Sequence, residues 1–137
     1  MFSFPDDEVK PILAEISKIS SLNARPILIA IDGPAGSGKT SLANQLASNL
    51  KSATTIHMDD LYNGWEDALT ATLTRHLEEW VLDPLTQHQS VKYQKFDWTI
   101  GEYGPTVEVS DVELLILEGV GAAQAKIRQQ ADLTIWI

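Results

Sequence analysis

A glycine-rich segment with one lysine and one threonine is the part of this chain best suited to chemistry. Residues 29–47 read IAIDGPAGSGKTSLANQLA, in which Gly33, Gly38, Lys39 and Thr40 match the spacing G-x-x-x-x-G-K-[ST]. In that pattern, backbone N–H groups surround phosphate oxygens, the lysine reaches the β- and γ-phosphates, and the threonine hydroxyl binds Mg²⁺. A helix that begins directly after the turn adds the positive end of its dipole. The segment therefore predicts a binding site for a nucleoside triphosphate.

We expect this triphosphate site to cover the whole turn. Its predicted residues are Gly33, Pro34, Ala35, Gly36, Ser37, Gly38, Lys39, Thr40 and Ser41. Lys39 is also expected to act in catalysis, because a fixed positive charge stabilises a phosphoryl group during transfer. The alternative is a turn that only packs a strand against a helix, but packing alone does not require the Lys-Thr pair.

Carboxylates at the ends of two apolar runs supply the other groups that phosphoryl transfer needs. Asp59 follows the run ATTIHM, and Glu118 ends the run LLILE. In an open parallel sheet such strand ends line the ligand site. We predict that Asp59 activates the acceptor and also faces the metal ion, and that Glu118 contacts magnesium directly or through water, beside Thr40. The alternative for Asp59 is a helix cap or a solvated carboxylate in a loop. The alternative for Glu118 is a salt bridge at the end of the strand.

Other polar and aromatic residues give weaker signals. Asp60 is left open between function and a loop position, and Asp32 is expected to support the glycine-rich turn. For His57 and His76 we favour packing or exposure over catalysis, and His88 lies in an unassigned segment. Six residues lie where an acceptor could bind: Tyr62, Trp65, Tyr93, Phe96, Asp97 and Trp98. The aromatic residues among them could stack on a base or simply pack, and their pattern fits both equally.

The elements that must position these residues alternate between strand and helix. Short β-branched or apolar runs predict strands at residues 27–31, 53–58, 113–119 and 132–137. Apolar spacing of three or four predicts helices at residues 8–20, 42–50, 67–82 and 122–130. The first helix requires Pro11 in its first turn, and the third is expected to start with an Asp67 cap and to end at Asp83–Pro84. Residues 84–110 are not assigned. This alternation predicts an α/β fold with a helix-covered parallel sheet.

Composition narrows the class of protein. The 137 residues suit one domain, and 44% hydrophobic with 21% charged residues indicates a packed core. A net charge of -9, without any lysine or arginine cluster, argues against a nucleic-acid polymer or an anionic membrane surface as partner. The chain has no cysteine and no signal-peptide or membrane-spanning pattern. We therefore expect a cytoplasmic protein.

The motifs together resemble the P-loop nucleoside and nucleotide kinases. IDGPAGSGKTSLA is similar to the phosphate loop of uridine kinase-like proteins and of bacterial cytidylate kinases, whereas HMDDLYNGW resembles the uridine kinase-like branch. The resemblance covers about residues 27–137 and implies a three-layer P-loop NTPase fold, strand order 2-3-1-4, and the use of ATP and Mg²⁺. It implies that Asp59 is the catalytic aspartate, that Tyr62 and Asp97 contact the acceptor, and that Glu118 faces magnesium.

The resemblance also has a limit. Members of this family continue past the strand that matches DLTIWI into an arginine-bearing lid, a further strand and an adenine-contacting loop, and neither Arg25, Arg75 nor Arg128 matches a lid position. We interpret the sequence as a single domain, residues 1–137, that lacks its C-terminal part; a short natural protein that forms a homo-oligomer is the alternative.

The predicted function is transfer of the ATP γ-phosphate to the hydroxyl of a small molecule, in the first place a nucleoside. Two alternatives stay open. One is a nucleotide-binding protein without turnover that regulates a partner. The other is transfer to a nucleoside monophosphate or to another alcohol, such as a pantothenate-like metabolite.

Overall fold

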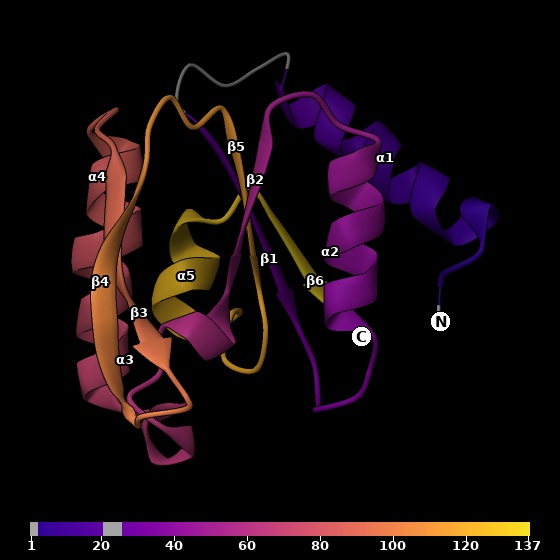
Figure 1. Cartoon of the computed structure of the whole chain (residues 1–137). Helices are drawn as coiled ribbons and strands as arrows, with labels where there is room; N and C mark the ends of the chain where they lie inside the picture. The colour runs from indigo at the N-terminus through magenta and orange to yellow at the C-terminus, as the bar shows by residue number, and fades with distance from the viewer. Residues whose placement is uncertain (1–2, 21–25) are drawn as a thin grey trace.

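A four-stranded parallel sheet forms the centre of this computed structural model, which describes residues 3–20 and 26–137 (Figure 1). The strands are β1 (Ile27–Asp32), β2 (Ala53–His57), β5 (Leu114–Glu118) and β6 (Leu133–Trp136), in the order β2-β5-β1-β6. The expected order 2-3-1-4, counted over the four predicted strands, is confirmed. Every residue of β1 and β5 is buried, as their uninterrupted apolar sequences predict for central strands of a parallel sheet.

Two helices cover one face of the sheet. They are α1 (Asp6–Ser20) and α2 (Lys39–Ser48), and they share a core with Ile27, Ile29 and Ile31 of β1. The expected first-turn position of Pro11 is wrong, because the helix already begins at Asp6. The N–H groups of Glu8 and Val9 both bond to the carbonyl of Pro5, which starts the helix early. The break expected after this helix lies largely in residues 21–25, outside the described residues.

The opposite face is covered by α5 (Ala125–Gln130) and a longer helical run. That run consists of α3 (Ala71–Leu77), the π-helical turn η3 (Glu78–Leu82) and α4 (Asp83–Thr86). None of the described helices is long and apolar enough to cross a bilayer.

Both predicted ends of the third helix are wrong. Thr70 is the N-cap, since its side chain accepts a hydrogen bond from Leu73 N, while Asp67 lies in the separate turn η2 (Trp65–Asp67). Pro84 does not stop the helix: in the π turn Asp83 N bonds to Glu78 O, and Pro84 then falls in the first turn of α4. A proline in a first turn removes no helical hydrogen bond.

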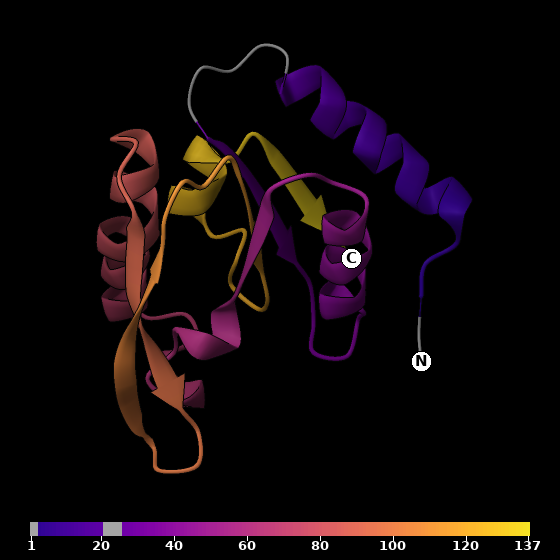
Figure 2. The same cartoon turned by 45° about the horizontal axis from the view of Figure 1, so that its top comes forward.

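An antiparallel hairpin occupies much of the segment that the sequence analysis left unassigned. Its strands are β3 (Val91–Asp97) and β4 (Glu102–Val109), with a register shift between Gln94 and Phe96. Figures 1 and 2 show the hairpin beside the α3–α4 run, away from α1 and α2. Its residues Val91 and Tyr93 join the core that also contains Met58, the first residue of the short turn η1 (Met58–Asp60) directly after β2. The hairpin is thus in place to contact the segment that carries Asp59.

Candidate functional site

The glycine-rich segment forms an open loop between β1 and α2. Gly36 and Gly38 have φ angles of +79° and +97°, which side chains with a Cβ rarely adopt. Gly38 is the N-cap of α2, with no side-chain cap and no acidic residue in the first helical turn. The first amides of α2 are therefore free of a competing side-chain acceptor. A cavity of about 410 Å³ is lined by Gly36, Ser37, Gly38, Lys39, Thr40 and Ser41. The loop thus has the shape and the donors that an anion needs.

Lys39 lies on the floor of this loop and is 8% exposed. Its Nζ donates a hydrogen bond to the carbonyl of Pro34 at 2.6 Å and lies 3.5 Å from Ser37 Oγ. The ammonium group is therefore folded back against its own loop, where it provides a positive charge inside the turn.

Asp32 stabilises the loop from below. Its buried carboxylate accepts hydrogen bonds from Gly33 N at 2.7 Å, Gly121 N at 3.2 Å and Ala123 N at 2.9 Å. These bonds join the start of the glycine-rich loop to the segment after β5. They agree with the supporting role expected for Asp32.

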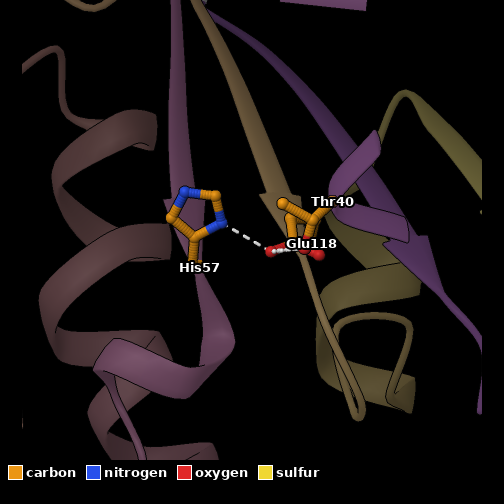
Figure 3. A network of polar contacts seen from close by, with 3 residues as sticks. All are labelled: Thr40, His57 and Glu118. Carbon is orange, nitrogen blue, oxygen red and sulfur yellow. Dashed lines mark hydrogen bonds and ion pairs between the residues drawn. The ribbon is translucent and has the colours of Figure 1, made fainter. Parts of the chain in front are cut away.

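Glu118 joins the loop to the end of β2, as Figure 3 shows. Its Oε1 atom accepts a hydrogen bond from Thr40 Oγ1 at 3.1 Å, and the same oxygen lies 2.5 Å from His57 Nδ1. Only 4% of Glu118 is exposed, so the carboxylate depends on these two partners. The expected proximity of Thr40 and Glu118 is therefore present, at the carboxyl end of the central strands.

His57 is the residue that the sequence analysis underestimated. It contacts Glu118 at the site instead of only packing or being exposed, and this hydrogen bond is the main cause that raises the pKa of His57. The contact follows from the sheet: in the parallel pair β2–β5, His57 and Glu118 are register partners. The expected strand order makes β2 and β5 neighbours, but the register between them was not predicted.

Asp59 lies in η1, just past the end of β2. Although the residue is exposed as a whole, partial loss of hydration raises the pKa of its carboxyl group, with further increases from the charges of Glu118 and Asp60. The charges of His57 and Lys39 lower the pKa of Asp59. The structure thus brings Asp59 into one electrostatic environment with Glu118, His57 and Lys39.

The acceptor side differs from expectation at Tyr62. This side chain is fully buried, and its hydroxyl donates a hydrogen bond to the carbonyl of Val120. Tyr62 therefore offers no surface to an acceptor in this arrangement, and the predicted contact is not supported. The family resemblance implied a contact with the acceptor, whereas an aromatic residue at this point of the sequence fits a core position as well as a ligand site.

Asp97 and two tryptophans remain on the accessible side. Asp97 lines a cavity of about 390 Å³ together with Asp60 and Trp98, and its Oδ1 also accepts a hydrogen bond from Thr99 N at 2.9 Å. Trp65 and Trp98 are exposed, and their rings meet in a tilted arrangement with centroids 5.0 Å apart. The remaining aromatic candidates, Tyr93 and Phe96, are buried.

The other two histidines stay outside the site. His76 stacks on Trp80 with ring centroids 4.1 Å apart, and His88 is exposed after α4. Within residues 3–20 and 26–137, no group of three or more acidic or histidine side chains is arranged to hold a metal ion.

Comparisons with known proteins agree with this geometry. The sequence model of the cytidylate kinase family matches residues 29–134. Two uridine kinases are similar in sequence: that of Ureaplasma parvum serovar 3 is 31% identical over 128 residues, and that of Ureaplasma urealyticum serovar 10 is 30% identical over 133 residues. These alignments cover 82% and 85% of this chain, which spans only 62% and 64% of the two relatives.

A solved structure has the same fold. The structure of a possible uridine kinase from Bacillus stearothermophilus superimposes with a TM-score of 0.78, at 23% sequence identity, over 96% of this chain and 79% of the other. At that identity the likeness concerns the fold alone. The family match, however, spans the phosphate loop, the Asp59 turn and Glu118. This chain belongs to the cytidylate kinase family of P-loop kinases.

Proposed function

We propose that this chain carries the phosphate-binding and acceptor-activating part of an ATP- and Mg²⁺-dependent nucleoside kinase. The uridine kinases among its relatives support a nucleoside as acceptor, as does the sequence HMDDLYNGW after β2. The observation that carries the proposal is the direct hydrogen bond between Thr40 and Glu118. It joins the phosphate loop to the strand end that lies beside Asp59.

In the proposed reaction each residue has a separate task. The amides of the loop and the ammonium group of Lys39 bind the triphosphate. Asp59 accepts the proton of the acceptor hydroxyl as that oxygen bonds to the γ-phosphorus and the bond to the β-phosphate breaks. Its raised pKa makes Asp59 a stronger base than an ordinary aspartate, which favours this task.

The residues present fit a magnesium ion. Thr40 and Glu118 would hold it, with Asp59 facing it from η1, and magnesium when bound neutralises charge on the phosphates during transfer. Because two donors share Glu118 Oε1, the other carboxylate oxygen remains for the metal or its water. Exposed Trp65 and Trp98 offer an apolar surface to the acceptor beside Asp59, and Asp97 is proposed to contact the acceptor from the same side.

A variant pair tests the role of Asp59. We expect Asp59→Asn to lower turnover by about 10²- to 10⁴-fold, the range for loss of a general base, while ATP affinity is retained. Asp60→Asn is the matched control, since it removes the neighbouring carboxylate instead. Transfer from γ-labelled ATP to a panel of nucleosides and nucleoside monophosphates measures turnover, and calorimetry measures ATP affinity. Full turnover by Asp59→Asn would show that the assigned base is wrong.

The second candidate is a nucleotide-binding protein that does not transfer phosphate. It rests on the cavity at the glycine-rich loop, lined by residues such as Lys39 and Thr40, which concerns nucleotide binding and not phosphate transfer. The same experiment separates the two candidates. ATP binding with no acceptor phosphorylated supports the second, and phosphorylation of a monophosphate in place of a nucleoside would correct the acceptor.

A further inference from the structure

The turn that carries Asp59 is held from outside by two side chains of the β3–β4 hairpin. Trp98 Nε1 donates a hydrogen bond to the carbonyl of Asp59 at 2.9 Å, and Tyr103 Oη donates one to the carbonyl of Leu61 at 2.8 Å. The two donors lie 39 and 42 residues from their acceptors in sequence. The hairpin and the turn after β2 are thus joined at two points on either side of Asp60.

The turn has little internal support of its own. η1 is a single 3₁₀ turn of three residues, and such short turns have strained hydrogen bonds. After it, the N–H groups of Leu61 and Tyr62 both bond to the one carbonyl of Met58. The carbonyls of Asp59 and Leu61 instead accept hydrogen bonds from the hairpin. The position of the Asp59 backbone therefore depends on a partner outside the turn.

Aromatic packing fixes the direction of the Trp98 indole. The ring contacts Trp65 in a tilted arrangement, with centroids 5.0 Å apart, and Phe96 in an edge-to-face arrangement, with centroids 4.9 Å apart. Phe96 in turn meets Tyr103 edge-to-face at 5.5 Å. The register shift between Gln94 and Phe96 places Phe96 opposite Tyr103 in the ladder, and such bulges redirect the side chains that follow them.

We infer that Trp98 is a positioning residue, which sets the place of the Asp59 carboxylate by binding its backbone carbonyl. Tyr103 holds the far end of the same turn. The inference rests on the proposed function, because it assumes that Asp59 accepts the hydroxyl proton. Trp98 itself transfers no proton: its indole N–H is a donor only.

The test compares three conservative variants of the full chain. Trp98→Phe removes the indole N–H and keeps an aromatic ring, and Tyr103→Phe removes the second donor. Trp65→Phe changes a ring that contacts Trp98 without removing either hydrogen bond. Hydrogen–deuterium exchange of residues 58–62 is the first readout. We expect exchange about 2- to 10-fold faster in Trp98→Phe and in Tyr103→Phe, the factor that one net hydrogen bond is worth, and the wild-type rate in Trp65→Phe.

Kinetics provide the second readout. Trp98→Phe should lower kcat by about the same 2- to 10-fold factor, without weakening ATP binding and with a smaller effect on the acceptor KM. A ring that only packs, or only binds the acceptor, would instead change stability or KM. Wild-type exchange in Trp98→Phe, or faster exchange with unchanged kcat, overturns the inference alone. A wild-type chain that phosphorylates no acceptor refutes the proposed function, and with it the catalytic meaning of the hydrogen bond.

Discussion

Replacing Gly119 by alanine probes the junction on which the site depends. Gly119 directly follows Glu118 and has a φ angle of +136°. A Cβ atom at this position would lie 2.6 Å from the Cβ atom of Met58 and 3.3 Å from Met58 N. Met58 immediately precedes Asp59. The substitution therefore forces apart the two strand ends that carry Glu118 and Asp59.

The cost has two parts. Ordinary van der Waals contact begins near 3.4 Å, so the main chains must separate by about 0.8 Å, because the Met58 Cβ cannot move without its backbone. Overpacking of this kind costs about 1–3 kcal/mol. A φ angle outside the region open to alanine adds about 1–3 kcal/mol. We expect Gly119→Ala to lower the free energy of unfolding by about 4 kcal/mol in total.

Urea denaturation measures this change, and Gly101→Ala is the matched control. Gly101 also has a positive φ, +72°, but a Cβ there meets nothing within 4 Å. Gly101→Ala should therefore lower the free energy of unfolding only by the cost of a left-handed backbone at alanine, about 1–2 kcal/mol. If Gly119→Ala is no more destabilising than Gly101→Ala, then the close approach of the two strand ends is wrong.

Two further predictions follow from the hydrogen bonds of His57 and Tyr62. Because the bond to Glu118 raises the pKa of His57 above 6.5, its stabilising effect is complete below pH 6.5 and is lost as pH rises through the raised pKa. The difference in unfolding free energy between wild type and His57→Gln should therefore shrink with rising pH, and a constant difference would contradict the ion pair. Tyr62→Phe leaves the Val120 carbonyl without its donor, so thermal or urea unfolding should show a loss of about 1–2 kcal/mol. Tyr62→Phe should leave the KM for the acceptor unchanged. An increase in this KM would indicate that Tyr62 contacts the acceptor after all.

The sequence predicted the phosphate loop and the central sheet because both depend on local patterns. The spacing of Gly33, Gly38, Lys39 and Thr40 is a short motif that is typical of a loop between a strand and a helix, and the apolar runs of β1 and β5 are typical of strands buried on both faces. The strand order came from the family resemblance. It brought the ends of β1, β2 and β5 together, which is why Thr40, Asp59 and Glu118 could be named as neighbours.

The hairpin and the contacts it makes could not be predicted in the same way. Its strands alternate between buried and exposed residues, but the register shift after Gln94 interrupts the period of two. The hydrogen bond from Trp98 to Asp59 spans 39 residues, and no local pattern encodes it. His57 was missed because its contact depends on the register between β2 and β5. Tyr62 was misplaced because sequence does not distinguish a buried tyrosine from one that faces a ligand.

Calorimetric titration of the chain with ATP in the presence of Mg²⁺ tests the central claim most directly. The predicted result is saturable binding of one ATP per chain, which Lys39→Ala abolishes or strongly weakens while the protein stays folded, because Lys39 is the positive charge inside the loop. Absence of binding at millimolar ATP by the folded wild-type chain, or equal affinity in Lys39→Ala, would contradict the assignment of this loop as a triphosphate site.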